Sequence, residues 1–415
     1  MTVDASPLEA LRAAVGFSPI GEVAGNLLIG KGSLDGRALR VAVVENRVAS
    51  GSLGKAEVAK FSPLLALTAR ERSPLVLCLD SAGARVSEGL DALGAFRRLF
   101  TEALAARAAG APVAAVLGRN CYGGASMLAH VASQRLFGPD TRLAMSGPAI
   151  LAQAAGGNAL DPMYVAMADA SIGAASRAQA CAANAVWTPG MDVGEWLRGA
   201  LAPGAGAWDA YRARHRELRE RLPSVPAARP PEGVRRRDLD RLFADGYEAR
   251  ECDGVLSGTL AGGGFLLGLV GAGHVGAARA WTFAEQAWTL ADAAAARVEV
   301  VLDCESHAAR FDDEKAVLSE YVVDMAAALA AARSRGADVR LTIVGRAGGG
   351  VYVALAAGAT RVAAARGADI QVLPGAALAS ILGRRQDAGA ECSEYLRAGV
   401  ADEDIKLGLP PGSRP

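Results

Sequence analysis

Glycine-rich turns follow several buried-strand patterns in this sequence and precede short helical patterns. The three turns that stand out contain Gly83-Ala84, Gly123-Gly124 and Gly349-Gly350. The first backbone amides of a helix have no acceptor within the helix, and the helix dipole adds partial positive charge there. Because glycine has no Cβ, an anionic oxygen can approach these amides closely. The turns are therefore candidate oxyanion sites, and close helix–sheet packing is the alternative explanation for their glycines.

Two side chains near these turns have the chemistry to exchange a proton. Tyr122 directly precedes one glycine pair, and His307 follows a predicted strand end, where ligands bind in open α/β sheets. Of the four histidines, His130 is expected to be packed within a helix, His215 falls in a charged segment and His274 in a glycine loop. We expect His307 or Tyr122 to donate a proton or contact substrate; for His307, a surface or supporting position is the alternative.

The remaining motifs argue against several other kinds of site. Gly271–Gly276 reads GxGxxG, but Asp303, the next acidic residue at a strand end, lies too far downstream for a dinucleotide fingerprint. We interpret this motif as a tight loop entering a helix and do not expect NAD. The sequence shows no G-x-S-x-G motif, Walker loop or biotin-attachment segment. Its six cysteines show no CxxC or zinc-ribbon spacing, so we expect reduced thiols and no metal site.

Strand and helix patterns alternate around these turns and must position them. The predicted strands span 38–45, 74–80, 111–117, 298–303 and 339–344, and the predicted helices span 55–70, 90–109, 125–132, 314–335 and 351–357. Strands that alternate with helices at this spacing indicate βα units and a largely parallel sheet. The sequence therefore predicts an α/β fold.

Landmarks of the first half recur in the same order in the second half. Asp80 is matched by Asp303, Gly118-Arg119 by Gly345-Arg346, and 143–151 by 370–378. Three landmarks at nearly constant separation predict a tandem duplication. Between the halves the chain becomes charged and proline-containing, as expected of a linker. The predicted organisation is an N-terminal domain over 1–204, a linker over 205–250 and a C-terminal domain over 251–415.

Composition narrows the function classes further. The 415 residues carry 44 basic and 44 acidic side chains, which excludes a strongly basic nucleic-acid-binding domain. The longest apolar stretches are broken by glycine and shorter than the roughly 20 residues that a bilayer requires. The N-terminus lacks the basic-then-apolar order of a signal peptide. We therefore expect a soluble cytoplasmic protein that binds neither nucleic acid nor membrane.

Longer segments resemble a known family. The first half resembles the carboxyltransferase branch of the crotonase superfamily, and within it the beta subunit of biotin-independent malonate decarboxylase. The second half is similar to the gamma subunit of that enzyme. The residues that carry the resemblance are Asp80–Gly89, Gly118–Ser126 and Leu143–Ile150 in the first half, and Val301–Glu314, Thr342–Leu355 and Ile370–Arg385 in the second.

The resemblance implies two tandem crotonase-like (ββα-superhelix) domains and a carboxy-lyase type of reaction. A malonyl or methylmalonyl thioester, carried by an acyl carrier protein or by coenzyme A on a phosphopantetheine-type arm, would lose CO2 through an enolate held by backbone amides. By resemblance, Gly83, Ala84, Gly123 and Gly124 would supply the enolate donors. Gly349 and Gly350 would face them across a domain or subunit interface and hold the departing carboxylate. No covalently bound cofactor is implied.

Two alternatives stay open at this point. The chain could be a carboxyltransferase that passes the malonyl carboxyl group to biotin on a carrier protein, or a non-catalytic scaffold that binds an acyl carrier. The expected partners are the acyl carrier protein or CoA thioester, an acyltransferase subunit, and further copies of the chain in a homo-oligomer.

Overall fold

The computed structural model describes residues 6–202, 208–219, 222, 233–271, 273–373, 378 and 390–406. The chain divides into two compact units. Unit 1 comprises Met1–Arg85, Arg98–Arg221 and Ala309–Val323, and unit 2 comprises Val86–Arg97, Leu222–Ala308 and Asp324–Pro415. Each unit therefore contains one segment from the opposite half of the sequence.

Within its described residues, unit 1 has an eight-stranded sheet in the order β1-β2-β3-β4-β5-β6-β8, with β7 paired to β5. Strand β2 is antiparallel to both β1 and β3, and every later pairing is parallel. The strands are β1 (Ser18–Pro19), β2 (Leu27–Leu34), β3 (Arg37–Val44), β4 (Leu75–Ser81), β5 (Val113–Tyr122), β6 (Gln134–Phe137), β7 (Arg142–Ala144) and β8 (Asn184–Val186).

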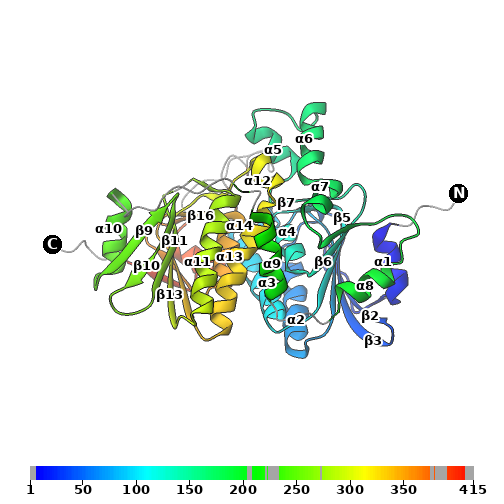
Figure 1. Ribbon diagram of the computed structural model, residues 1–415, viewed down its shortest axis with the longest axis horizontal. Helices are drawn as coiled ribbons and strands as arrows, with labels where there is room; N and C mark the ends of the chain where they lie inside the picture. The colour runs from blue at the N-terminus through cyan, green and yellow to red at the C-terminus, as the bar shows by residue number, and fades with distance from the viewer. Residues whose placement is uncertain are drawn as a thin grey trace. The chain divides into compact units, whose positions relative to one another are not determined.

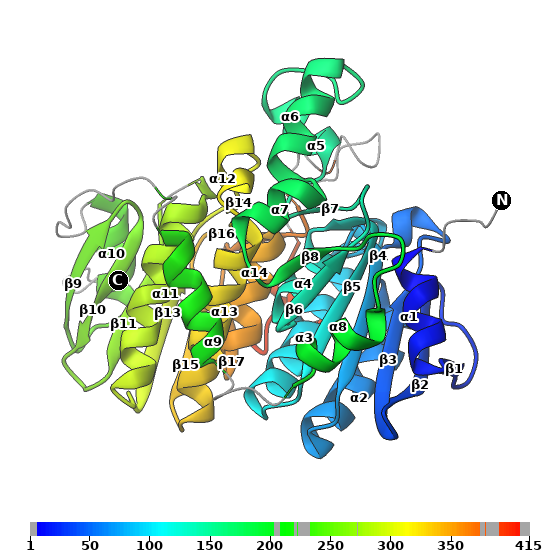
Figure 2. The ribbon, with the colours of Figure 1, turned by 45° about the vertical axis from the view of Figure 1, so that its right-hand side comes forward.

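Helices of unit 1 cover this sheet with apolar side chains. Helices α1 (Pro7–Val15) and α8 (Val193–Ala200) pack on one face, as Figure 2 shows, and share a buried core with Val41, Ala114 and Val116 of the central strands. The other helices of the unit are α2 (Lys55–Glu71), α4 (Gly124–Val131), α5 (Pro148–Ala154), α6 (Pro162–Ile172), α7 (Ala174–Ala180), α9 (Asp209–Leu218) and α12 (Phe311–Lys315).

Unit 2 is built on a second, mainly parallel sheet (Figure 1). Its described strands follow the order β19-β17-β15-β13-β11-β10-β9, and β12 pairs with β14 and β16 with β18. The strands are β9 (Tyr247–Cys252), β10 (Val255–Leu260), β11 (Phe265–Leu269), β12 (His274–Val275), β13 (Arg297–Leu302), β14 (Ser306–His307), β15 (Asp338–Ile343), β16 (Arg346–Gly348), β17 (Arg361–Ala365), β18 (Asp369–Gln371) and β19 (Glu403–Ile405). Helices α10 (Gly233–Leu242), α11 (Ala277–Asp292), α14 (Gly349–Gly358) and α16 (Cys392–Arg397) complete the unit.

The two sheets share one plan. In each, an antiparallel pair leads into parallel strands, so that β3, β4, β5 and β6 of unit 1 correspond to β11, β13, β15 and β17 of unit 2. A short parallel pairing directly precedes the glycine turn in both units, between β5 and β7 in unit 1 and between β16 and β18 in unit 2. The predicted α/β fold with largely parallel sheets is confirmed.

The segments that belong to the opposite unit lie at the start of two long helices. Helix α3 (Leu90–Ala108) begins in unit 2 and continues into unit 1, whereas α13 (Leu318–Ser334) begins in unit 1 and continues into unit 2. The single helix predicted over 314–335 is wrong, because α12 ends at Lys315 and the buried Val317 adopts a left-handed φ of 66° that no α-helix allows.

Other sequence-based expectations are met only in part by the described residues. The predicted linker over 205–250 contains α9 and α10, but 203–207, 220–221 and 223–232 lie outside the described residues. The same holds for 374–377, within the repeat predicted over 370–378, and for Ala272 of the GxGxxG loop. The domain boundaries 1–204 and 251–415 therefore stay a prediction about the duplicated sequence blocks.

Two further properties concern the helices and the thiols. None of the helices in the described ranges is long and apolar enough to cross a membrane. The six cysteines, all of which are described, are free thiols.

A pair of glycine substitutions tests how the first part of α3 packs in unit 2. A Cβ on Gly94 would lie 1.9 Å from the carbonyl oxygen of Ala398, whereas a Cβ on Gly199 in α8 would meet nothing within 4 Å. We expect Gly94→Ala to lower the free energy of unfolding by about 1–3 kcal/mol through overpacking. Gly199→Ala, the matched control, is expected to raise it by up to about 1 kcal/mol, because alanine favours helix. Urea unfolding measures both, and equal effects would contradict the close contact.

Candidate functional site

Two glycine turns of unit 1 meet at the ends of neighbouring parallel strands. The first, Ser81–Ala84, follows β4, and the second, Tyr122–Gly124, joins β5 to α4. A Cβ on Gly83 would lie 2.7 Å from the amide nitrogen of Gly124, so the two turns are in backbone contact. Gly83, with a φ of 90°, and Gly123, with a φ of 53°, are both in the left-handed region that favours glycine. We call these two segments the unit 1 turn pair.

The unit 1 turn pair presents two backbone donors. The Gly83 amide donates to Ser81 Oγ at 3.0 Å, and the Gly123 amide donates to the carbonyl oxygens of Ala144 and Met145 at 3.1 and 3.2 Å. In the part of the chain that the structure describes, neither the Ala84 amide nor the Gly124 amide has a hydrogen-bond acceptor. Both residues are only half-buried. An oxygen that carries negative charge can therefore bind there, and the α4 dipole favours it.

An aspartate braces the turn in each unit. Asp80 Oδ1 accepts from the Asn120 amide at 3.1 Å in unit 1, and Asp303 Oδ1 accepts from the Arg346 amide at 2.9 Å in unit 2. Glycine is required beside both carboxyl groups, since a Cβ on Gly345 would lie 2.2 Å from Asp303 Oδ1. A Cβ on Gly118 would likewise lie 2.5 Å from Asp80 Cβ. This common bracing accounts for two of the landmarks that recur in the sequence.

The glycine turn of unit 2 lies against a serine and a histidine. Gly349, with a φ of 55°, donates its amide to the Val372 carbonyl at 3.1 Å. A Cβ at this position would lie 2.2 Å from Ser306 Oγ and 3.5 Å from His307 Nδ1, so both side chains pack on the turn. Ser306 Oγ and His307 Nδ1 are 3.1 Å apart. Unit 2 therefore brings together Gly349, Gly350 and His307 of the predicted site residues.

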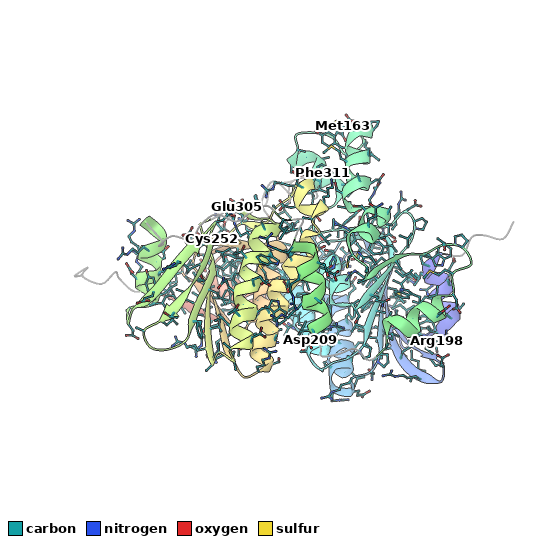
Figure 3. All side chains as sticks on the ribbon, viewed as in Figure 1. Met163, Arg198, Asp209, Cys252, Glu305 and Phe311 are labelled. Carbon is teal, nitrogen blue, oxygen red and sulfur yellow. The ribbon has the colours of Figure 1, made fainter. Side chains whose placement is uncertain are left out.

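His307 is neutral at neutral pH. It is 8% exposed, and burial, helped by the nearby His274, lowers the pKa of His307 to about 4. A neutral imidazole can form hydrogen bonds but carries no imidazolium proton ready for transfer to carbon. In the same unit, His274 lies 3.3 Å from Glu305, which also pairs with Arg346 and is labelled in Figure 3.

Tyr122 keeps its proton beside the unit 1 turn pair. Burial raises the pKa of Tyr122 to about 12, so its hydroxyl group is protonated at neutral pH and able to donate. This hydroxyl donates to Asn120 Oδ1 at 3.1 Å, and the ring packs against Gly147, where a Cβ would lie 3.3 Å from it. Tyr122 and the turn pair therefore occupy one unit, whereas His307 belongs to the other.

Sequence reasoning missed a group of buried charged side chains in unit 1. Its members are His130, Arg135, Arg177, Glu314 and Glu320, all of them fully buried. His130 is packed within a helix, as predicted, and its Nδ1 lies 2.6 Å from Glu320 Oε2. Glu314 and Glu320 come from segment 309–323 of the second half, so no pattern local to the first half could reveal these pairs.

Part of the first half of the sequence is similar to known proteins. Residues 12–162 match the family model of the carboxyl transferase domain. The methylmalonyl-CoA decarboxylase subunit alpha of Veillonella parvula is 28% identical over 141 residues, which cover 32% of this chain and 28% of the relative. The acetyl-coenzyme A carboxylase carboxyl transferase subunit beta 1 of Roseiflexus castenholzii is 32% identical, over 31% of this chain and 43% of the relative. The chain thus spans less than half the length of these curated relatives.

Solved structures also resemble the chain. A Pseudomonas malonate decarboxylase hetero-tetramer in complex with malonate aligns with 56% of this chain and 95% of its own chain, at 24% identity and a TM-score of 0.46. The transcarboxylase 12S hexamer with hydrolysed methylmalonyl-coenzyme A aligns with 97% of this chain and 86% of its own, at 17% identity and a TM-score of 0.38.

Because buried His307 is neutral in the folded chain, we expect the free energy of unfolding to fall as the pH is lowered. In the unfolded chain this histidine takes up a proton below about pH 6.5, whereas in the folded chain it does so only near pH 4. Its contribution to the free energy of unfolding is therefore present above about pH 6.5 and is lost as the pH falls toward 4. We expect the difference in stability between the wild type and His307→Gln to shift against the wild type between pH 7.5 and pH 5. Urea titrations at the two pH values measure it, and a constant difference would contradict burial of the neutral ring.

Proposed function

We propose that this chain decarboxylates a malonyl or methylmalonyl thioester to the acetyl or propionyl thioester. The observation that supports it most is the pair of half-buried, unengaged amides of Ala84 and Gly124, which lie on touching turns beside the N-terminus of α4. Amides in this arrangement favour a reaction in which negative charge develops on an oxygen. The match to the carboxyl transferase domain over 12–162 and the methylmalonyl-CoA decarboxylase relative support the same chemistry.

In the proposed reaction the bond between the carboxylate carbon and the α-carbon breaks. Its electron pair moves toward the thioester carbonyl, CO2 leaves, and an enolate oxygen forms. The amides of Ala84 and Gly124 would donate to this oxygen, and Gly83 and Gly123 would hold the two turns in place. One preorganised donor of this kind contributes about 3–4 kcal/mol to transition-state stabilisation in other enzymes. The enolate carbon then takes a proton, which gives the shortened acyl thioester.

Tyr122 is the proton donor that we favour for this last step. Its phenol is protonated at neutral pH, and it lies directly before the Gly123-Gly124 turn. His307, the other candidate, is neutral and belongs to unit 2. We assign His307 the support of the Gly349 turn. Gly349 and Gly350, by correspondence with the turn of unit 1, form a second proposed anion-binding element of the chain.

A carboxyltransferase is the second candidate function. The matching family model is that of the carboxyl transferase domain, and the relatives include the carboxyl transferase subunit of an acetyl-coenzyme A carboxylase. The same enolate would then form while the carboxyl group passes to biotin on a separate carrier protein. In either case we propose CoA or an acyl carrier protein as the carrier of the thioester. An acyltransferase subunit and further copies of the chain are the proposed protein partners.

Mass spectrometry of the acyl thioesters separates these functions. Malonyl- and methylmalonyl-CoA, and the same acyl groups on an acyl carrier protein, are incubated with the full chain. We expect at least one of them to lose the mass of CO2 in the absence of any biotin protein. Loss of the carboxyl group only when a biotinylated carrier is added would favour the carboxyltransferase. An unchanged acyl mass in every pairing would contradict both functions.

A glycine substitution tests the oxyanion assignment directly. We expect Gly124→Val to lower kcat by about 100-fold or more, because the added side chain would hinder the approach of an oxygen to the backbone amide. This loss is comparable to the removal of an oxyanion donor in other enzymes. Its matched control is Gly262→Val, at a glycine of the turn between β10 and β11 where a Cβ would meet nothing within 4 Å. Steady-state decarboxylation rates measure both variants. Activity that survives the change at Gly124, or falls equally in both, would exclude the unit 1 turn pair as the enolate site.

A further inference from the structure

The segment Ala309–Val323 comes from the second half of the sequence but packs into unit 1, and we call it the exchanged segment. It contacts unit 1 at two places. Its first helix, α12, packs on α6 through Phe311, whose ring is stacked on that of Tyr164 at a centroid separation of 6.4 Å. Figure 3 labels Phe311 at this position. The next residues enter the interior of the unit, because Glu314, Ser319 and Glu320 are completely buried. The exchanged segment thus reaches the core of unit 1.

Glu314 binds the backbone of the loop that follows β7. Its Oε1 accepts from the Ser146 amide at 2.8 Å. Arg177 holds the same region, since its Nε donates to the Leu143 carbonyl at 2.9 Å and its Nη1 to the Glu314 carbonyl at 2.7 Å. Arg177 Nη2 and Glu314 Oε2 are 3.5 Å apart, and burial raises the pKa of Glu314 to about 7. Carboxylate and guanidinium together therefore fix the loop at 143–146.

The same loop fixes the glycine turn. The carbonyl oxygens of Ala144 and Met145 accept from the Gly123 amide. Ser126 Oγ donates to the Gly123 carbonyl at 2.7 Å and lies 3.4 Å from Met145 Sδ. Gly123 is therefore held through both its amide and its carbonyl group, whereas the next amide, that of Gly124, has no acceptor among the described residues. Only one short loop separates the Glu314 carboxylate from the turn.

The C-terminal end of α4 is held by the same exchanged segment. His130, in the last turn of this helix, lies with Nε2 at 2.8 Å from Ser319 Oγ and with Nδ1 at 2.6 Å from Glu320 Oε2. Arg135 Nη2 approaches the same Glu320 oxygen at 3.4 Å. Helix α4 therefore has contacts with 309–323 near its last turn, and with the loop that Glu314 binds near its first.

We propose that Glu314 is a positioning residue that sets the orientation of the Gly123-Gly124 turn through the loop at 144–146. Its consequence for catalysis rests on the function proposed above, but its effect on the turn does not. The buried pair of Glu314 and Arg177 is expected to add little net stability, because the cost of removing two charges from water offsets most of their attraction. A buried carboxyl group that accepts the Ser146 amide restrains the loop, and precise placement of donors is what an oxyanion site requires.

The variants that test this proposal are Glu314→Ala, Glu314→Gln and Asp313→Asn. Alanine removes the acceptor, whereas glutamine keeps a side-chain oxygen of the same reach and lacks the charge. Asp313→Asn is the matched control, because this neighbouring acid is almost as buried but forms its ion pair with Arg310. Hydrogen exchange of the peptide that covers 122–131 reports on the turn, and exchange of β4 reports on the unit as a whole.

We expect Glu314→Ala to speed exchange of the turn peptide by about tenfold or more while β4 keeps its protection. Glu314→Gln should restore slow exchange, and Asp313→Asn should leave it at the wild-type rate. If Glu314→Ala does not fold, the comparison of Glu314→Gln with Asp313→Asn remains, and wild-type protection in the glutamine variant is the expected result. Faster exchange in the control as well as in the Glu314 variants, or a glutamine variant as exposed as the alanine variant, would overturn the proposal.

Decarboxylation kinetics supply the second readout. Misplacement of the turn should lower kcat of Glu314→Ala by about 10- to 100-fold with little change in KM, and glutamine should restore most of it. An equal loss in the Asp313→Asn control would indicate a purely structural effect and would contradict a positioning role. If the wild type decarboxylates no thioester, the proposed function fails, and hydrogen exchange still decides whether Glu314 sets the turn.

Discussion

A close approach of backbone to backbone governs the architecture of each unit. In unit 1 the chain leaving β4 must pass so near the start of α4 that no Cβ fits at Gly83. In both units an aspartate at a strand end accepts a backbone amide, that of Asn120 or Arg346, and a glycine beside that aspartate makes room. Parallel strands deliver their C-terminal ends to the same edge of a sheet, so these contacts all form there. Glycines such as Gly83, Gly118 and Gly345 therefore allow the close contacts at this edge of the sheet.

Much of the fold could be predicted because its signals are local. Buried strands such as 74–80 and helices such as 55–70 are read from runs and periods of apolar residues, and the structure places β4 and α2 there. The break between α12 and α13 could not be predicted in this way. Every residue from 314 to 335 is compatible with a helix, and no local pattern marks the left-handed turn at the buried Val317.

The candidate site likewise contains some residues that local sequence patterns reveal and others that they do not. Gly83, Ala84, Gly123 and Gly124 could be found because a glycine turn between a strand and a helix is visible in a few consecutive letters. The state of His307 could not be, since its pKa depends on burial and on His274, which is distant in sequence. No local sequence pattern distinguished Glu314 from its neighbours. It reads as one acid among three at a helix start, and its partner Ser146 is 168 residues away.

The interleaving of the two units has a consequence for synthesis on the ribosome. Unit 1 cannot receive Ala309–Val323 until about one hundred residues beyond Arg221 have been made. At typical elongation rates of about 5–20 residues per second this takes about 5–20 s. Throughout that interval the nascent domain carries Arg177, His130 and Arg135 without their acidic partners from the exchanged segment. Unit 1 is therefore completed late, by a segment from the second half of the sequence, although most of its own sequence emerges first.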